Sequence, residues 1–294
     1  MNVKDMLLGI AVGDAFGAGI EFQSRDWIKD NIDFTQYVKT VPSETYKLGD
    51  YSDDTEMTIG LMKALISQKP FTQELLVEFW KKEYDQGLQA NGHYRHGYGS
   101  IKNYFKGTKT LEEVRDIQRA LKYPGNAPPM RAVPLGLLKD DLINPYALIN
   151  ADATHPHPKA RSASILVARA AEYVMVQKAY PKHVITYCKE HVKGIDEETD
   201  QQLFLMDQLP IPGKLEEQHY EILCGPQPLQ KPVSWATGIK GLGSDAMRTA
   251  CTALYIIKHS TNTFTALKTS ISIGGDVDSL ASICTGILAG RYGL

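Results

Sequence analysis

The chain has 294 residues, 43% of them hydrophobic and 22% charged, and its formal net charge is −2 at pH 7. This composition is that of a globular protein long enough to bury a large core in one or two domains. The small negative charge provides no broad basic surface, which argues against nucleic acid as a partner.

The cysteines and the apolar segments indicate a cytoplasmic protein. The four cysteines lie far apart, without zinc-finger spacing, and are expected to be reduced thiols: Cys188, Cys224, Cys251 and Cys284. The apolar run at residues 6–12 is bracketed by acidic residues and is much shorter than the ~20 residues of a membrane span. We therefore expect a soluble protein without a signal peptide or a membrane partner, and we favour a monomer.

The amino-terminal segment is rich in glycine and reads Gly9-x-x-x-Gly13-Asp14-Ala15-x-Gly17-x-Gly19-Ile20-Glu21. It fails as a dinucleotide-binding fingerprint, because Phe22 occupies the last glycine position and no strand precedes it. Gly9 and Gly13 instead predict close helix packing. Glu21 follows a flexible segment, so it could swing over a cleft as a lid.

Most of the remaining chain shows helical periodicity. Strand alternation is confined to residues 37–41, where Pro42 stops it. Thr72 precedes an apolar stripe that includes Leu75 and Trp80, which predicts an amphipathic helix. The chain is therefore predicted to be mainly α-helical.

Further helices are predicted from capping signals and from hydrophobicity. Thr110 and Glu113 form a capping box, and Ser244 is expected to open a helix that ends near His259. Three segments are apolar nearly all round, as is typical of helices in the centre of a bundle: residues 57–66, 162–176 and 280–289. Residues 123–134 and 194–232 are predicted to form loops or short helices. No segment reads as a convincing linker, so we expect one all-α domain over residues 1–294.

Two acidic segments near opposite ends of the chain each precede an apolar helix. Residues 49–55 read Gly-Asp-Tyr-Ser-Asp-Asp-Thr, and residues 274–279 read Gly-Gly-Asp-Val-Asp-Ser. Helix capping explains either segment alone about as well as ligand binding does. It does not explain the excess of carboxylates, because one cap needs one oxygen and clustered carboxylates repel unless a cation lies between them.

The donor atoms of these segments narrow the choice of metal. Carboxylate and hydroxyl oxygens favour Mg²⁺ or Mn²⁺ over zinc, and neither segment has the twelve-residue spacing of an EF-hand. If the two segments meet in one cleft, they form a two-metal centre with ions roughly 3.5–4 Å apart. Such a centre activates water and binds hydroxyls or phosphates.

The loops between the acidic segments carry groups that suit a nucleotide. Tyr98 could stack on a base, while glycine amides or Arg131 could bind phosphate. Ordinary turn chemistry is the stronger explanation for any single residue here. His155 precedes a helix predicted from about Ala160 and is expected to hydrogen-bond a ligand or the backbone, because a hard-oxygen metal site has no need of imidazole.

Five blocks in this order resemble the ADP-ribosylglycohydrolase family, which includes the ADP-ribosylarginine and ADP-ribosylserine hydrolases. The blocks are the glycine-rich segment from Gly9, Tyr-Ser-Asp-Asp-Thr-x-Met from Tyr51, Gly-Asn…Met-Arg from Gly125, Thr-His from Thr154 and Gly-Gly-Asp-x-Asp-Ser…Ala-Gly-x-Tyr-Gly from Gly274. The resemblance implies a single-domain, all-α orthogonal bundle with a central cleft for two Mg²⁺ or Mn²⁺ ions. It also implies an enzyme that removes ADP-ribose from a modified acceptor.

The resemblance assigns roles to individual residues. The implied metal ligands are Ser52, Asp53, Asp54, Asp276, Asp278 and Ser279. Glu21 is similar to the family's mobile glutamate, which closes on the metals or the distal ribose, and Asp276 matches the aspartate thought to assist the attacking water. The residues that fall where the family holds ADP-ribose are Tyr98, Gly99, Gly125, Asn126 and His155.

One departure from the family pattern keeps alternatives open. Pro128 and Pro129 remove amide donors where a pyrophosphate would lean. The leading interpretation is hydrolysis of ADP-ribose from a protein, with arginine slightly favoured over serine as the acceptor. A catalytically idle relative that binds ADP-ribose or serves structurally is the second. Another all-α diphosphate enzyme, such as a terpenoid synthase, is a remote third, because Asp53-Asp54-x-Glu56 has no matching second triad.

Overall fold

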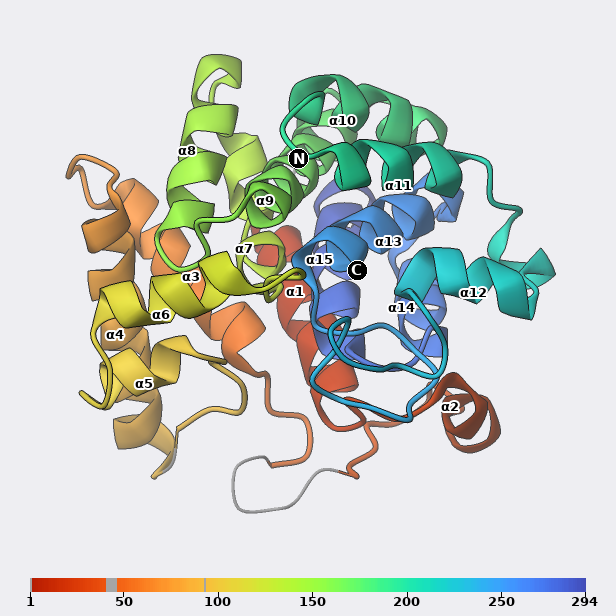
Figure 1. Cartoon of the computed structure of the whole chain (residues 1–294), viewed down its shortest axis with the longest axis horizontal. Helices are drawn as coiled ribbons and strands as arrows, with labels where there is room; N and C mark the ends of the chain where they lie inside the picture. Colours follow the sequence, from red (N-terminus) through yellow and green to blue (C-terminus); the bar gives the residue numbers. More distant parts are fainter. Residues whose placement is uncertain (1, 41–46, 93) are drawn as a thin grey trace.

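The computed structural model describes residues 2–40, 47–92 and 94–294, and their regular structure is helical (Figure 1). Contacts of the β type in these ranges are isolated bridges, such as the one between Gln23 and Gly275. The predicted all-α, single-domain class is confirmed. None of the described helices combines the length and the apolar character needed to cross a membrane.

The α-helices follow one another along the chain, and the longer connections precede α3 and α13. Their bounds are α1 Val3–Ala18, α2 Arg25–Asn31, α3 Asp53–Ile66, α4 Gln73–Asn91, α5 Ile101–Phe105, α6 Leu111–Ala120, α7 Ala127–Met130, α8 Asp140–Asp152, α9 Pro158–Ala171, α10 Val184–Val192, α11 Glu197–Asp207, α12 Glu217–Cys224, α13 Ala246–His259, α14 Thr263–Ser272 and α15 Val277–Tyr292. Shorter 3-10 helices are η1 Val133–Leu137, η3 Pro181–His183 and η4 Pro212–Lys214, and the π-helical turn η2, Glu172–Val176, continues α9.

Two of the predicted helix starts are confirmed, and one is displaced by a residue. Thr72 caps α4, and Thr110 forms the predicted capping box with Glu113 at the start of α6. Helix α13 is capped by Asp245 rather than Ser244, because the Asp245 carboxylate accepts a hydrogen bond from a backbone amide of the first turn. The Ser244 hydroxyl instead accepts a hydrogen bond from a neighbouring indole.

The strand predicted at residues 37–41 is absent from residues 37–40, so for these residues the prediction is wrong. Residues 37–40 form no strand, since the backbone of Thr40 bonds to Gly19 in a single contact and no neighbouring strand continues it. Residue 41 and Pro42 lie outside the described residues. The segment 194–232 contains α11 and α12, and buried residues of both, such as Leu203 and Leu223, belong to the main hydrophobic core. No domain boundary therefore lies there.

The centre of the molecule is the antiparallel contact between α1 and α15, which lie side by side in Figure 1 although they come from opposite ends of the chain. Gly9, Gly13 and Gly17 face α15 along this contact. A Cβ atom at Gly13 would lie 2.6 Å from the carbonyl oxygen of Ala281, and one at Gly17 would lie 2.5 Å from the amide of Asp278. The predicted close packing at Gly9 and Gly13 is confirmed, and it continues as far as the second acidic segment.

We predict that Gly13→Ala lowers the free energy of unfolding by about 1–3 kcal/mol, because the added methyl group overlaps backbone atoms of α15 that cannot move aside. The matched control is Gly213→Ala, where nothing lies within 4 Å of the added Cβ. Urea denaturation followed by circular dichroism measures both variants. Equal stabilities would contradict the close-packing explanation.

Candidate active site

A cavity of about 1250 Å³ lies where loops from nearly the whole length of the chain come together. Of the predicted site residues, those that line it are Glu21, Asp53, Asp54, Tyr98, Gly99, Gly125, Asn126, His155, Asp276, Asp278 and Ser279. Ser52 is outside this lining and is fully buried. The two acidic segments and the predicted nucleotide loops therefore share one cavity.

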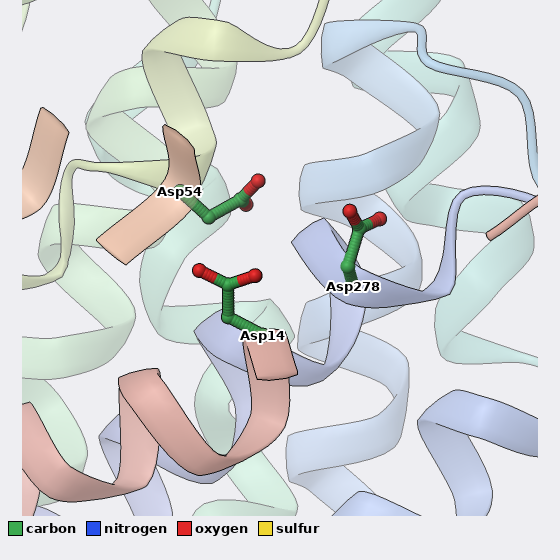
Figure 2. A group of neighbouring side chains, drawn as sticks. All are labelled: Asp14, Asp54 and Asp278. Carbon is green, nitrogen blue, oxygen red and sulfur yellow. The ribbon is translucent and has the colours of Figure 1, made fainter. Parts of the chain in front are cut away.

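Carboxylates from separate segments meet at one end of this cavity. The side chains of Asp14, Asp54 and Asp278 extend from α1, α3 and α15 toward a common space, with one oxygen of each within 4.8 Å of the others (Figure 2). Glu21, Asp276 and Asp278 form a second group, in which one oxygen of each carboxylate also lies within 4.8 Å of the others. Asp278 belongs to both groups, so the two sets of carboxylates are continuous.

Asp14 was not predicted as a site residue, yet it joins α1 to the first acidic segment. Its carboxylate accepts hydrogen bonds from the Ser52 amide at 2.9 Å, from the Thr55 amide at 2.9 Å and from the Thr55 hydroxyl at 2.6 Å. It therefore satisfies free amides at the start of α3, as an N-terminal acid does. A carboxylate on an otherwise apolar, glycine-lined helix face is the sequence signal that indicates such a buried partner.

The two acidic segments differ in how far capping explains them. Ser52 caps α3 through the Asp54 amide, and its hydroxyl lies 3.2 Å from an Asp54 carboxylate oxygen, to which it donates. Asp276 occupies the cap position of α15 but makes no side-chain capping bond. Asp276 Oδ1 and Asp278 Oδ1 are buried with no hydrogen-bond partner among the described residues. Capping therefore accounts for Ser52 and leaves the second segment unexplained.

Burial and mutual repulsion disfavour the charged forms of these carboxyls. Burial, with Asp14, Asp53 and Asp276 nearby, raises the pKa of Asp54 well above its ordinary value. Burial next to Glu21, Asp276 and Asp54 does the same to the pKa of Asp278. Burial raises the pKa of Asp53 to about 7, although a hydrogen bond from the Tyr98 backbone opposes the shift. A divalent cation would relieve this repulsion.

Glu21 is tied to the opposite wall of the cavity. One of its carboxylate oxygens lies 2.8 Å from Nε2 of His96, and the backbone carbonyl of His96 accepts a hydrogen bond from the Asp53 amide at 3.1 Å. This contact with Glu21 raises the pKa of His96, while burial raises the pKa of Glu21. His96 thus links Glu21 to the first acidic segment, a connection that no sequence motif indicated.

The loop that follows His96 packs closely against Asp53, and its backbone is in the left-handed region. Gly97, Tyr98 and Gly99 have φ values of 97°, 62° and 42°. A Cβ at Gly97 would overlap the Asp53 carboxylate, so only glycine fits there. The ring of Tyr98 is 2% exposed, and its hydroxyl donates to Glu56 at 2.6 Å. The predicted stacking of a base on Tyr98 does not fit this position, because the ring is already enclosed.

Arg131 also departs from its prediction. Its guanidinium is fully buried, donates to Asn150 and Thr154, and lies 3.7 Å from the centre of the Trp80 ring. It therefore stabilises the wall of the cavity, and its donors are not free for phosphate. Arg131 also affects the cavity through Thr154, whose hydroxyl bonds to both Arg131 and His155.

His155 is held as a neutral hydrogen-bond donor. The Thr154 hydroxyl accepts from Arg131 at 2.8 Å and lies 2.7 Å from His155 Nδ1, so its own proton is available for that nitrogen. Burial, aided by the nearby Arg131, lowers the pKa of His155 well below its ordinary value. In the tautomer in which Nδ1 accepts the hydrogen bond from Thr154, the ring proton resides on Nε2, which lies next to Gly125 in the cavity lining.

The remaining predicted ligand residues line the same cavity as His155. The Gly125 amide already donates to Gln118 at 2.9 Å, so it is not free for phosphate, whereas Gly99 has open space around its Cα. Asn126 donates to Thr249. Pro128 and Pro129 lie in the first turn of α7, where amides have no helical partner, so the helix loses no hydrogen bond. They still offer no donor to the cavity.

Tyr123 and Trp235 are two of the aromatic residues that line the cavity without having been predicted as site residues. Tyr123 contacts Arg248 on its ring, 4.4 Å from the centroid, and donates to Glu198. Trp235 is 68% exposed and packs on Phe22. Neither lies in a motif with a recognisable spacing, so only the three-dimensional arrangement brings them to the site.

Comparisons with known proteins agree with this architecture. The family model described as ADP-ribosylglycohydrolase matches residues 2–294. The ADP-ribosylhydrolase ARH3 of Gallus gallus is 23% identical over 98% of this chain and 84% of its own length. The ADP-ribosyl-(dinitrogen reductase) glycohydrolase of Rhodospirillum rubrum is 28% identical over 57% of this chain and 56% of its own length.

A solved structure supports the fold independently of the sequence matches. It is titled ADP-ribosylglycohydrolase-related protein complex, is 18% identical in sequence and aligns with a TM-score of 0.57 over 99% of this chain and 87% of its own. The family match extends over nearly every residue, and the fold agrees with it. The chain belongs to the ADP-ribosylglycohydrolase family.

Proposed function

We propose that this protein is a metal-dependent hydrolase that releases ADP-ribose from a modified protein side chain, with arginine favoured over serine. The observation that carries the proposal is the convergence of two acidic segments from opposite ends of the chain on one large cavity. Membership of the family supports the reaction class. The nature of the acceptor and the use of metal are our own extension.

The donor set at the acidic end fits hard divalent cations. Asp276 and Asp278 each bury an oxygen without a hydrogen-bond partner, and a buried anion in that state is costly unless a cation neutralises it. All the donors are oxygens, which favours two Mg²⁺ or Mn²⁺ ions. The residues that we propose to hold them are Ser52, Asp53, Asp54, Asp276, Asp278 and Ser279. The Ser52 hydroxyl, which donates its proton to Asp54, would offer an oxygen lone pair to the cation.

The proposed reaction adds water to the anomeric carbon of the distal ribose and breaks the bond from that carbon to the acceptor atom. Bound divalent ions would polarise water and ribose hydroxyls at this end of the cavity. The Asp276 carboxylate, whose Oδ1 has no other partner in the described structure, would accept the water's proton. Glu21 would stabilise the positive charge that develops on the ribose, and the acceptor would leave with a proton.

The rest of the cavity would hold the nucleotide portion. His155 presents a neutral Nε2 donor that suits a phosphate or ribose oxygen without adding charge. Gly99 leaves room for close approach, and Asn126 lies beside Gly125 in the same wall. We propose that the backbone around Tyr98, rather than its enclosed ring, contacts the ligand.

We predict that the purified protein with Mg²⁺ or Mn²⁺ releases ADP-ribose from an ADP-ribosylated arginine peptide, and that Glu21→Gln lowers kcat/KM by about 100-fold or more. The exposed Glu190→Gln serves as the matched control and should leave the rate unchanged. Chromatographic detection of free ADP-ribose measures the reaction. Lack of release from arginine-, serine- and nucleobase-linked substrates, with metal bound, would refute the hydrolase proposal.

Metal binding can be tested without substrate. We predict that Mn²⁺ raises the melting temperature of the metal-free protein, and that Asp278→Asn weakens the affinity at least tenfold, because Asp278 belongs to both carboxylate groups. Asp30→Asn, an exposed change in α2, should bind Mn²⁺ as the unaltered protein does. Calorimetric titration measures the affinities, and equal values for the two variants would exclude Asp278 as a ligand.

The pH dependence of the metal-free protein follows from the raised pKa values. The folded-state pKa of Asp53 is about 7, above its ordinary 3.8, so between these values the folded state binds more protons than the unfolded state. Stability from this group is therefore present at low pH and lost as pH rises toward 7. Relative to the unaltered protein, Asp53→Asn in EDTA should gain stability from pH 4.5 to 7.5. A difference that is constant across that range would contradict the assigned shift.

An idle ADP-ribose-binding relative is the second candidate, and Pro128 and Pro129 favour it because they leave α7 with two residues that have no amide donor next to the cavity-lining Ala127 and Met130. In that case calorimetry would detect tight ADP-ribose binding while the release assay stayed negative. Measurable turnover would exclude it.

A further inference from the structure

An aromatic pair, formed by the partly buried Phe22 and the exposed Trp235, lines the cavity together with the acidic residues. The rings of Phe22 and Trp235 pack edge to face, with centroids 4.5 Å apart and planes at 70°. Both residues line the same cavity as Glu21, Asp276 and Asp278. Trp235 is 68% exposed, although a large aromatic side chain gains most from burial.

Both rings are held by the backbone and by side chains that border the cavity. Phe22 has a left-handed backbone, with φ of 60°, and its amide donates to the carbonyl of Gly275 at 2.8 Å. The indole nitrogen of Trp235 donates to the Ser244 hydroxyl at 3.1 Å. The pair is therefore attached to the second acidic segment on one side and to the start of α13 on the other.

We propose that Trp235, supported by Phe22, binds a planar cationic acceptor, the guanidinium of an ADP-ribosylated arginine side chain. An indole face attracts a cation, and guanidinium groups stack on aromatic rings more readily than ammonium groups do. Phe22 directly follows Glu21, and both aromatic residues line the cavity that the carboxylates of Glu21, Asp276 and Asp278 line. A serine hydroxyl offers neither the charge nor the plane that this surface recognises.

The opposite assignment, in which Trp235 stacks on the base of ADP-ribose, fits the charges less well. A neutral base carries no positive charge for the carboxylates near Phe22 to attract. Tyr123, which also lines the cavity, offers another aromatic ring for the base. Arg248 packs on this ring, and the Tyr123 hydroxyl donates a hydrogen bond to Glu198. This inference rests on the proposed function, because it requires the distal ribose to bind at the acidic end.

The test compares binding and turnover for Trp235→Ala, Trp235→Phe and Tyr180→Ala, the last being an equally exposed aromatic residue outside the cavity. Trp235→Ala should lower kcat/KM for an ADP-ribosyl-arginine peptide by about 3- to 30-fold, the range of a partly desolvated cation–π contact. Trp235→Phe should recover most of the loss. The affinity for free ADP-ribose and the kcat/KM for an ADP-ribosyl-serine peptide should change less than twofold.

The same preference can be measured without turnover by calorimetry on variants that also carry Glu21→Gln. The quantity of interest is how much more tightly the ADP-ribosyl-arginine peptide binds than free ADP-ribose does. A gain that disappears in Trp235→Ala supports the inference even if the unaltered protein hydrolyses nothing, in which case only the proposed hydrolase activity fails. Turnover of the arginine peptide with no effect of Trp235→Ala overturns the inference and leaves the activity standing. An equal loss for both peptides and for free ADP-ribose would show that Trp235 contacts the nucleotide, and would also overturn it.

Discussion

The close contact between α1 and α15 is the constraint on which the position of the site depends. Gly9, Gly13 and Gly17 allow the two helices to approach until backbone touches backbone, and Gly17 meets the chain at Asp278 itself. Asp14 projects from the same helix into the start of α3. The interface between α1 and α15 therefore fixes the position of both acidic segments relative to each other. A methyl group added at this interface would displace the carboxylates as well as core atoms.

The acidic end of the cavity stores unfavourable electrostatic energy that the fold must support. Burial raises the pKa values of Asp54 and Asp278, and their mutual proximity adds to the effect. The apolar packing of α1, α3 and α15 supplies the stability that offsets this repulsion. Such an arrangement is typical of a site prepared for a cation, because the same carboxylates that repel one another become favourable ligands when positive charge arrives.

Away from the acidic end, two side chains that were predicted to contact a ligand are enclosed in the cavity wall. Arg131 is enclosed and acts through Thr154, whose hydroxyl orients the ring of His155. Tyr98 is likewise enclosed, so it shapes the loop that presses on Asp53 instead of offering its ring. The clustered carboxylates and the exposed ring of Trp235 line the same cavity, and cationic side chains such as Lys102 and Lys231 line it as well.

The sequence by itself determined the helical class, the helix starts at Thr72 and Thr110, and the two acidic segments, because periodicity, capping and local charge are encoded within a few residues. It did not determine that Asp14 completes the carboxylate cluster or that His96 contacts Glu21. It also could not tell an exposed side chain from an enclosed one, which misplaced the roles of Tyr98 and Arg131. Those facts depend on contacts between distant segments, which only the packed tertiary structure decides.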